Sequence, residues 1–363
     1  MKCYLGSKWF KVTAALIGML AAAWAVGAAW DGYKVAEMTE KMKTVCMGRM
    51  TIDLPEEAEV ELYGTWISGF GIHAFAESPD AFQARVAERK AEIRATPDRL
   101  GGSNNLESVQ EVRTANGLAG KMFVHGRYVT EGDAYNAIGE EHYRYEGVAL
   151  EAHVHGKGIS IELSAKKYDP ALMGNLPRLL AQLVPNPANR IPAEPGFCFD
   201  RAYIRDPLSA DDGERVVMTA KLPSRPDIEL HFDTMAGIAP DPRGPRGLLV
   251  RNAEARSRLS AILNMRVTDL RAAPRTIGGL RGDELVQLVI ESNLAVVYGF
   301  QWEVDGTEDN VLFPDLLLRM ATGRGEDEPV RSSLSQPAAL ALWDRIVSSI
   351  RVRGAAAAAP VSQ

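Results

Sequence analysis

The stretch EPGFCFDRAYI, from Glu194 to Ile204, follows a Pro-Gly break and holds one of the three cysteines of this 363-residue chain. An earlier stretch, MKTVCMGRMTIDLP from Met42 to Pro55, has the same pattern, because both contain C-x-x-R-x-x-I starting at Cys198 and Cys46 respectively. Each stretch is rich in apolar residues next to a turn signal and predicts an opening strand. The repeated motif indicates a chain of two related halves.

The same order of elements follows each opening strand. The sequence predicts strands, a helix, about four strands and a second helix in each half, from alternating apolar residues and from N-cap residues followed by proline. Strands are predicted at 44–55, 60–75, 106–114, 118–129, 140–154, 158–167, 198–204, 214–222, 227–235, 265–274, 280–290, 294–304 and 315–322; helices are predicted after Ser78 and Asp169, at 252–264 and after Ser335.

A second echo supports duplication. RTANGLAGK at 113–121 and RAAPRTIGGLRGD at 271–283 share a strand, a turn with G-L-x-G and a second strand. The proline-rich run VPNPANRIPAEPG is the best linker in the chain. We therefore predict an α+β fold of two similar domains, 43–185 and 192–353, each an antiparallel sheet with covering helices. The tail 354–363 is alanine-rich and predicted to be disordered.

The N-terminus predicts export. Lys2, Lys8 and Lys11 precede the apolar run Val12–Trp30, and no acidic residue occurs before Asp31. At about 1.5 Å per residue, the run is roughly 28 Å long as a helix, close to the hydrocarbon thickness of a bilayer. Residues 1–30 are therefore either an uncleaved anchor that holds the chain in the inner membrane through 12–30, or a signal peptide cleaved among small residues. Either way the remainder is expected in the periplasm.

The net charge of the chain limits the classes of partner that it can bind. It carries 41 basic and 47 acidic residues, a formal charge of -6, and three of the basic residues belong to the N-terminal segment. An acidic body of this kind excludes nucleic acid as a partner and permits a basic protein surface. Solubility alone explains most of these charges.

The sequence contains little that indicates catalysis. It has no G-x-S-x-G nucleophile motif, no phosphate-binding glycine loop and no H-E-x-x-H. One weak metal candidate is Glu151-Ala-His153-Val-His155, because alternate residues of a strand share one face and could meet a zinc ion. A polar strand face explains the same residues more simply. We predict no cofactor, no metal and no enzyme activity.

Other candidate site residues are acidic or cysteine. Acidic loop residues that could contact a basic partner are Asp211, Asp212, Glu326, Asp327 and Glu328. Cys3 precedes the apolar run, so only Cys46 and Cys198 remain in an oxidising compartment, where disulfides persist. We predict a Cys46–Cys198 disulfide.

Four segments together resemble a known family. MKTVCMGRMTIDLP, IPAEPGFCFDRAYI, LRAAPRTIGGLRGDELV and TGRGEDEPVRSSLSQPAALALWDRIVSSIRVR occur in the order expected for the periplasmic immunity proteins that neutralise type VI secretion lipase effectors, the Tle cognate immunity proteins. The resemblance covers about residues 43–353. It implies stoichiometric inhibition of a cognate phospholipase effector, gripped at its lid between the two domains, and it assigns no interface residues.

Two other functions are compatible with the residues alone. A metal-dependent envelope hydrolase could be built around His153 and His155. An anchored envelope scaffold or sensor module with another protein partner is also compatible with two linked domains.

Overall fold

The computed structural model describes residues 32–136, 139–208, 212–237, 247–307, 310–324 and 329–353. The predicted membrane or signal segment, 1–30, and the predicted disordered tail, 354–363, lie outside this range. Within it, no helix is both long and apolar enough to cross a membrane. A helix over residues 32–40 precedes the first strand.

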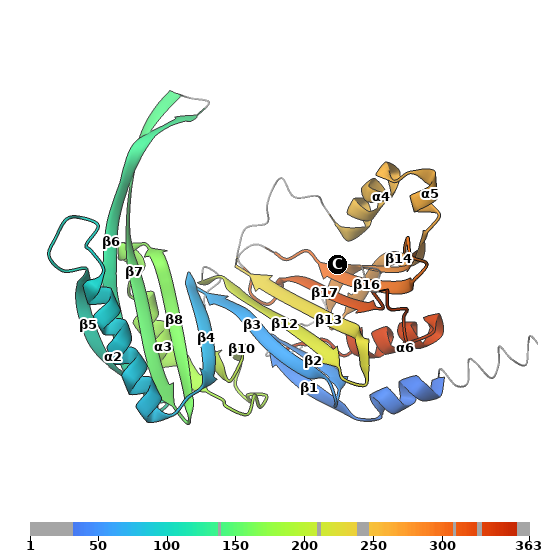
Figure 1. Cartoon of the computed structure of the whole chain (residues 1–363), viewed down its shortest axis with the longest axis horizontal. Coiled ribbons are helices and arrows are strands. Elements are labelled where there is room, and N and C mark those ends of the chain that lie inside the picture. Colours follow the sequence, from blue (N-terminus) through green and yellow to red (C-terminus); the bar gives the residue numbers. More distant parts are fainter. Residues whose placement is uncertain are drawn as a thin grey trace, which may run out of the picture.

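One antiparallel sheet of twelve strands runs through both halves of the chain (Figure 1), in the order β14-β15-β16-β17-β13-β12-β3-β4-β8-β7-β6-β5. Two small sheets, β1-β2-β18 and β10-β11-β9, lie beside it. The strands are β1 Met42–Met47, β2 Met50–Pro55, β3 Glu59–Ile67, β4 Phe70–Ala76, β5 Leu106–Arg113, β6 Ala119–Asn136, β7 Gly139–Gly156, β8 Ile159–Tyr168, β9 Leu183–Pro185, β10 Gly196–Phe199, β11 Ala202–Arg205, β12 Glu214–Leu222, β13 Arg225–Ala236, β14 Val267–Ile277, β15 Leu280–Ile290, β16 Val296–Val304, β17 Asp315–Thr322 and β18 Arg351–Val352. The predicted α+β class with antiparallel sheets and covering helices is confirmed.

The helices are α2 Pro79–Ala95, α3 Asn175–Gln182, α4 Leu248–Arg258, α5 Ala261–Asn264 and α6 Gln336–Val347, with a 3-10 turn η1 at Pro170–Leu172. The helix starts predicted at Ser78 and Ser335 are confirmed, and the Ser78 side chain accepts a hydrogen bond from the Ala81 N–H. The helix predicted at 252–264 is two helices, because Ser260 caps a new turn.

The two halves join where β3 pairs with β12. Strand β3 pairs with β4 only over Thr65–Ile67, after which β4 pairs with β8. Strands β1, β2 and β3 therefore lie with the C-terminal strands, although they come before α2 in the chain. The domain boundaries 43–185 and 192–353 stay a prediction. In space the long sheet has two parts, which we call lobes: β4 to β8 form the N-terminal lobe, and β3 with β12 to β17 forms the C-terminal lobe. The boundary between β3 and β4 is called the seam.

A single large core lies on one face of the long sheet. It includes Leu176 and Leu179 from α3, Trp343 from α6 and the apolar side chains of β2. Trp343 packs on Phe300, and its indole N–H donates to Glu284 at 2.7 Å. A separate small cluster lies under α2 and contains Phe82, Val86, Ile93, Leu106 and Phe123. The second face of the sheet is thus covered only in part.

The predicted Cys46–Cys198 disulfide is present and joins two residues that are 152 positions apart in the sequence. Backbone hydrogen bonds between Gly48 and Cys198, 2.7 and 2.8 Å long, hold the two opening strands together. Gly48 has φ of +53°, and a Cβ there would lie 3.0 Å from Thr234, so the turn after β1 requires glycine. Near the end of the chain, the Arg353 guanidinium lies 3.1 and 2.9 Å from the two sulfurs and donates to the Pro192 carbonyl.

A buried ion pair accompanies the disulfide. Arg49, 5% exposed, donates three hydrogen bonds of 2.7 to 3.1 Å to Glu214, which is 2% exposed, and two more to Asp206. Burial raises the pKa of Glu214 even though the Arg49 guanidinium opposes this. The charge of Glu214 therefore depends on Arg49 remaining in place.

Arg49→Ala is expected to lower the free energy of unfolding by about 3–5 kcal/mol, because it leaves the buried Glu214 carboxylate without its partner. Arg215→Ala is the matched control: Arg215 is 47% exposed and pairs with Asp233, so its loss costs less than about 1 kcal/mol. Denaturant unfolding measures both. Equal losses in the two variants would contradict the assignment.

Replacing Cys46 and Cys198 by alanine is expected to lower the free energy of unfolding by about 2–5 kcal/mol, because the long closed loop restricts the unfolded chain. Cys3→Ser serves as the control and should leave unfolding unchanged. A non-reducing peptide map should show the two peptides linked. Free thiols at both positions would refute the bond.

Candidate partner-binding face

The long sheet has one covered and one open face in its C-terminal lobe. Met218, Phe232, Leu318 and Trp302 form a cross-strand row that is fully or almost fully buried. The adjacent row points to the other side, because neighbouring residues of a strand alternate. The side chains of that side that belong to the central strands are called here the open face: Glu61, Tyr63, Arg215, Thr219, His231, Asp233, Gln301, Leu317 and Arg319.

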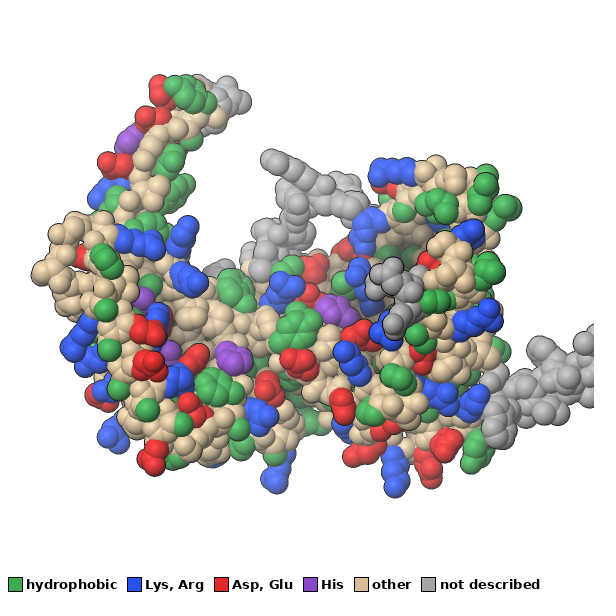
Figure 2. Space-filling model, in the orientation of Figure 1, with side chains coloured by type: hydrophobic (Ala, Val, Ile, Leu, Met, Phe, Trp, Pro, Cys, Tyr) green, Lys and Arg blue, Asp and Glu red, His purple; other side chains and the backbone are tan. Residues whose placement is uncertain are grey.

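Helices cover the two ends of this side, and no helix of the described residues covers its middle. At the C-terminal end, α4 lies over β15, where Gln287 donates to Asn252 at 3.1 Å and Arg251 pairs with Glu303. At the N-terminal end, α2 covers β7 and β8 through Arg85 and Arg89. Figure 2 shows a hollow between the two ends, over the central strands labelled in Figure 1.

Two projections border the hollow. The hairpin of β6 and β7 rises at one end, and α4 with α5 rises at the other (Figure 1). Side chains exposed around α5 are mostly apolar: Leu259, Ile262, Leu263 and Met265. A contiguous exposed apolar patch of this kind is typical of a surface that binds another molecule.

Among the predicted acidic contacts, Asp212 lies in the seam and not on the surface. It is buried and paired with Arg178 of α3. Next to it, the Ser68 N–H donates to the Gly213 carbonyl at 3.1 Å, and Tyr168 donates to the Ser68 carbonyl at 3.0 Å. Asp212 thus ties the two lobes together. Asp211, Glu326, Asp327 and Glu328 lie outside the described residues.

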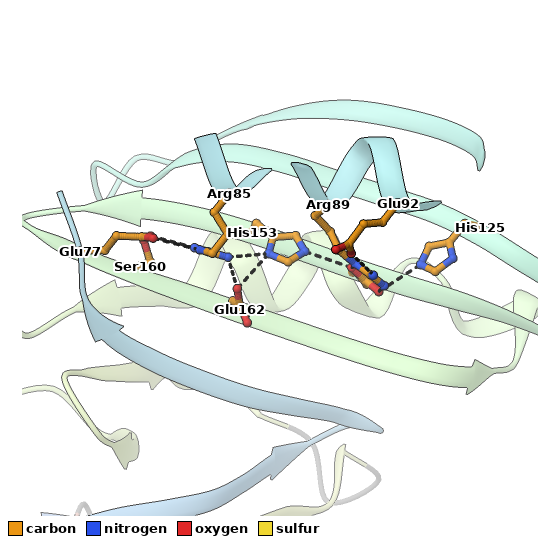
Figure 3. Close-up of polar contacts among 9 residues, drawn as sticks. Glu77, Arg85, Arg89, Glu92, His125, His153, Ser160 and Glu162 are labelled. Carbon is orange, nitrogen blue, oxygen red and sulfur yellow. Dashed lines mark hydrogen bonds and ion pairs between the residues drawn. The ribbon is translucent and has the colours of Figure 1, made fainter. Parts of the chain in front are cut away.

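Glu151, His153 and His155 do share one face of β7, as predicted, but α2 covers that face (Figure 3). One ring nitrogen of His153 is 3.1 Å from Glu151 and the other is 3.3 Å from Glu162. His155 instead lies 3.0 Å from the Glu77 carbonyl and stacks on Phe82. The imidazoles are therefore used in separate contacts.

Arginines of α2 complete this network. Arg89 donates two hydrogen bonds to Glu151, which is also 3.1 Å from His125, and Arg85 pairs with Glu77 and Glu162 (Figure 3). The network joins α2 to β6, β7 and β8 and explains why the side of α2 that faces the sheet carries arginines. Among the described residues, no group of three or more possible ligands is arranged to hold a metal ion.

The pKa values of the network follow from burial and charge. Burial lowers the pKa of His153, but hydrogen bonds to Glu151 and Glu162 outweigh this and raise it above the ordinary value. Burial raises the pKa of Glu151, but the hydrogen bonds from Arg89, His125 and His153 lower it well below its usual range. The hydrogen bond to His153 also lowers the pKa of Glu162.

The N-terminal lobe is therefore expected to be most stable between about pH 4.5 and 6.5, the ordinary pKa values of glutamate and histidine. The His153 contribution is complete below about pH 6.5 and is lost as pH rises through its raised pKa. Wild-type protein should lose more free energy of unfolding between pH 6 and pH 8.5 than His153→Gln, measured in urea. Parallel pH curves would contradict this role of His153.

Sequence reasoning missed the tyrosines of the β6–β7 hairpin. The run EEHYRYEG at 140–147 alternates tyrosine with charged residues, which is the signal of a strand with two different faces. We predicted the strand from this run but did not assign a role to its tyrosines.

Comparisons with known proteins follow the same division of the chain. The family model for the Tle cognate immunity protein 4 N-terminal domain matches residues 43–170, and the model for the C-terminal domain matches residues 190–355. No curated protein sequence matches the chain.

Solved structures share the fold. The apo immunity protein TplEi of T6SS from Pseudomonas aeruginosa has a TM-score of 0.68 at 25% identity, covering 87% of this chain and 99% of that one. TplEi complexed with "L" peptide has a TM-score of 0.66 at 24% identity, covering 86% and 98%. A chain of the Tle4-Tli4 complex has a TM-score of 0.66 at 24% identity, covering 86% and 97%. With both domain models matched in order, the resemblance seen in the sequence is confirmed, and the chain belongs to the Tle cognate immunity protein 4 family.

Proposed function

We propose that this chain is an immunity protein that binds a cognate lipase effector of a type VI secretion system and blocks it stoichiometrically, without turnover. The observation that carries the proposal is the match of both domain models of the immunity family, one after the other along the chain. TplEi is described as a T6SS immunity protein, and a similar chain is part of the Tle4-Tli4 complex.

The effector is proposed to dock in the hollow above the open face and to be gripped, with its lid, between the two lobes. This surface suits a protein partner because it is broad and mixed in character. Arg215 and Asp233 form an ion pair on it, and Tyr63 and Leu317 add apolar area. Mixed polar and apolar surfaces with tyrosine and arginine are typical of protein interfaces.

The grip requires two lobes held at a constant separation. Strand β3 pairs with β4 across the seam at Thr65–Ile67, and Arg178 joins α3 to Asp212. Asp211 and residues 326–328 are proposed to add acidic contacts, because such side chains suit a basic patch on a partner.

The chain is proposed to act in the periplasm. The apolar run 12–30 supports export as an anchor or a cleaved signal, and the Cys46–Cys198 disulfide suits an oxidising compartment. A periplasmic inhibitor would meet the effector before the effector reaches the membranes of the cell.

A titration tests the proposal. Increasing amounts of the purified chain are added to a fixed amount of the lipase-type effector encoded beside it, recognised by its G-x-S-x-G motif. Phospholipase activity should fall linearly and reach zero at a 1:1 ratio, and an unrelated phospholipase should stay active. Loss of activity with time at sub-stoichiometric amounts would indicate an enzyme, and full activity at excess would refute the proposal.

A further inference from the structure

The hairpin of β6 and β7 extends beyond the rest of the sheet. Strand β5 pairs with β6 only as far as His125, and β8 pairs with β7 only as far as Val148. From Tyr128 to Asn136 and from Gly139 to Gly147, the two strands pair only with each other among the strands of the described chain. We call this part the ribbon. It offers two faces to its surroundings.

The two faces of the ribbon differ sharply in charge. Alternation and register place Tyr128, Thr130, Gly132, Ala134, Glu141, Tyr143, Tyr145 and Gly147 on one face, called the tyrosine face. They place Val129, Glu131, Asp133, Tyr135, Glu140, His142, Arg144 and Glu146 on the other. The tyrosine face carries one charge, Glu141, close to the hairpin turn. The other face carries a series of ion pairs, including Arg144 with Glu146 at 2.8 Å.

Glycines allow the tyrosine rings to lie against the ribbon backbone. Gly147 is opposite Tyr128, and a Cβ on it would come within 2.4 Å of that ring; Gly132 is opposite Tyr143, whose hydroxyl would be 2.9 Å away. The rings of Tyr143 and Tyr145 are 5.4 Å apart. Rings held in this way lose little conformational entropy when a partner packs on them.

The tyrosine face is directed to the same side as the open face. On β7, Tyr143 and Tyr145 lie an even number of residues before Glu151 and His153, so all four side chains are on the face that α2 covers further along. The irregularity between His125 and Tyr128 places an extra residue in β6 and leaves the alternation of β7 unbroken. In Figure 2 the charged side chains of the ribbon point outward, and the hydrophobic ones point toward the hollow. A partner in the hollow would therefore meet the tyrosines.

We infer that the tyrosine face is an anchor for the effector and packs against an uncharged, apolar patch of that protein. The inference rests on the proposed function and goes beyond it by assigning the contact and its chemistry. A negatively charged patch is excluded because it would lose water against Tyr128, Tyr143 and Tyr145 without gaining a counter-charge. An anionic lipid surface is disfavoured because it attracts cations, and this face has none.

Binding of full-length variants to the effector encoded beside this chain tests the inference. Tyr145→Ala, and Tyr143→Ala with Tyr145→Ala, are expected to raise the Kd at least about 30-fold, the effect typical of a hot spot. Arg144→Ala is the matched control, because it lies between the two tyrosines on the opposite face. Its Kd should stay within about twofold of wild type, since an exposed ion pair contributes little.

Tyrosine iodination of the wild-type complex gives a second measurement that needs no variant. Tyr145 is 66% exposed on the tyrosine face, and Tyr135 is 81% exposed on the other. The effector should protect Tyr145 and leave Tyr135 reactive. Equal protection of both, unchanged reactivity of Tyr145, or equal losses in the Tyr145→Ala and Arg144→Ala variants would overturn the inference while wild type still binds. Absence of binding by wild type would overturn the proposed function, and the inference with it.

Discussion

The pairing of β3 with β12 along one edge and with β4 along the other is the interaction on which the rest of the structure depends. It converts two sheets into one, so the ribbon and α4–α5 stand on a common support. The disulfide, the Arg49–Glu214 pair and the Arg178–Asp212 pair all lie close to this seam in the fold. Buried charge pairs contribute little net stability but strongly penalise other arrangements, which suits a junction that must keep one geometry.

The two sides of the continuous sheet have different physical roles. One side collects the large core under α3 and α6 and carries most of the apolar burial. On the other side, the described helices lie only at the ends, and central side chains such as Tyr63 and Arg215 are exposed. A protein that binds a large partner needs such an uncovered area on a rigid element.

Much of the fold could be predicted from particular residues. The C-x-x-R-x-x-I repeat located both opening segments, but each is a hairpin, β1–β2 and β10–β11, and not the single strand predicted, because the chain reverses at Gly48 and at Asp200–Arg201. Export combined with cysteine scarcity identified the Cys46–Cys198 bond. Ser78-Pro79 and Ser335 marked helix starts because capping is a local property. The alternation around His153 is also a local pattern, but the role of His153 could not be predicted from it. Arg85 and Arg89 come from a separate helix, and they make the histidine part of an ion-pair network.

The sequence by itself determined the class of fold, the disulfide and the family, because periodicity, caps and motifs act over short stretches of chain. Tertiary structure decided that β3 crosses to the C-terminal strands, that Asp212 is a seam residue, and that the tyrosines of 140–147 line a hollow. These depend on pairings between segments far apart in the chain. A single strand pattern specifies which residues share a face but not which neighbour that face will meet.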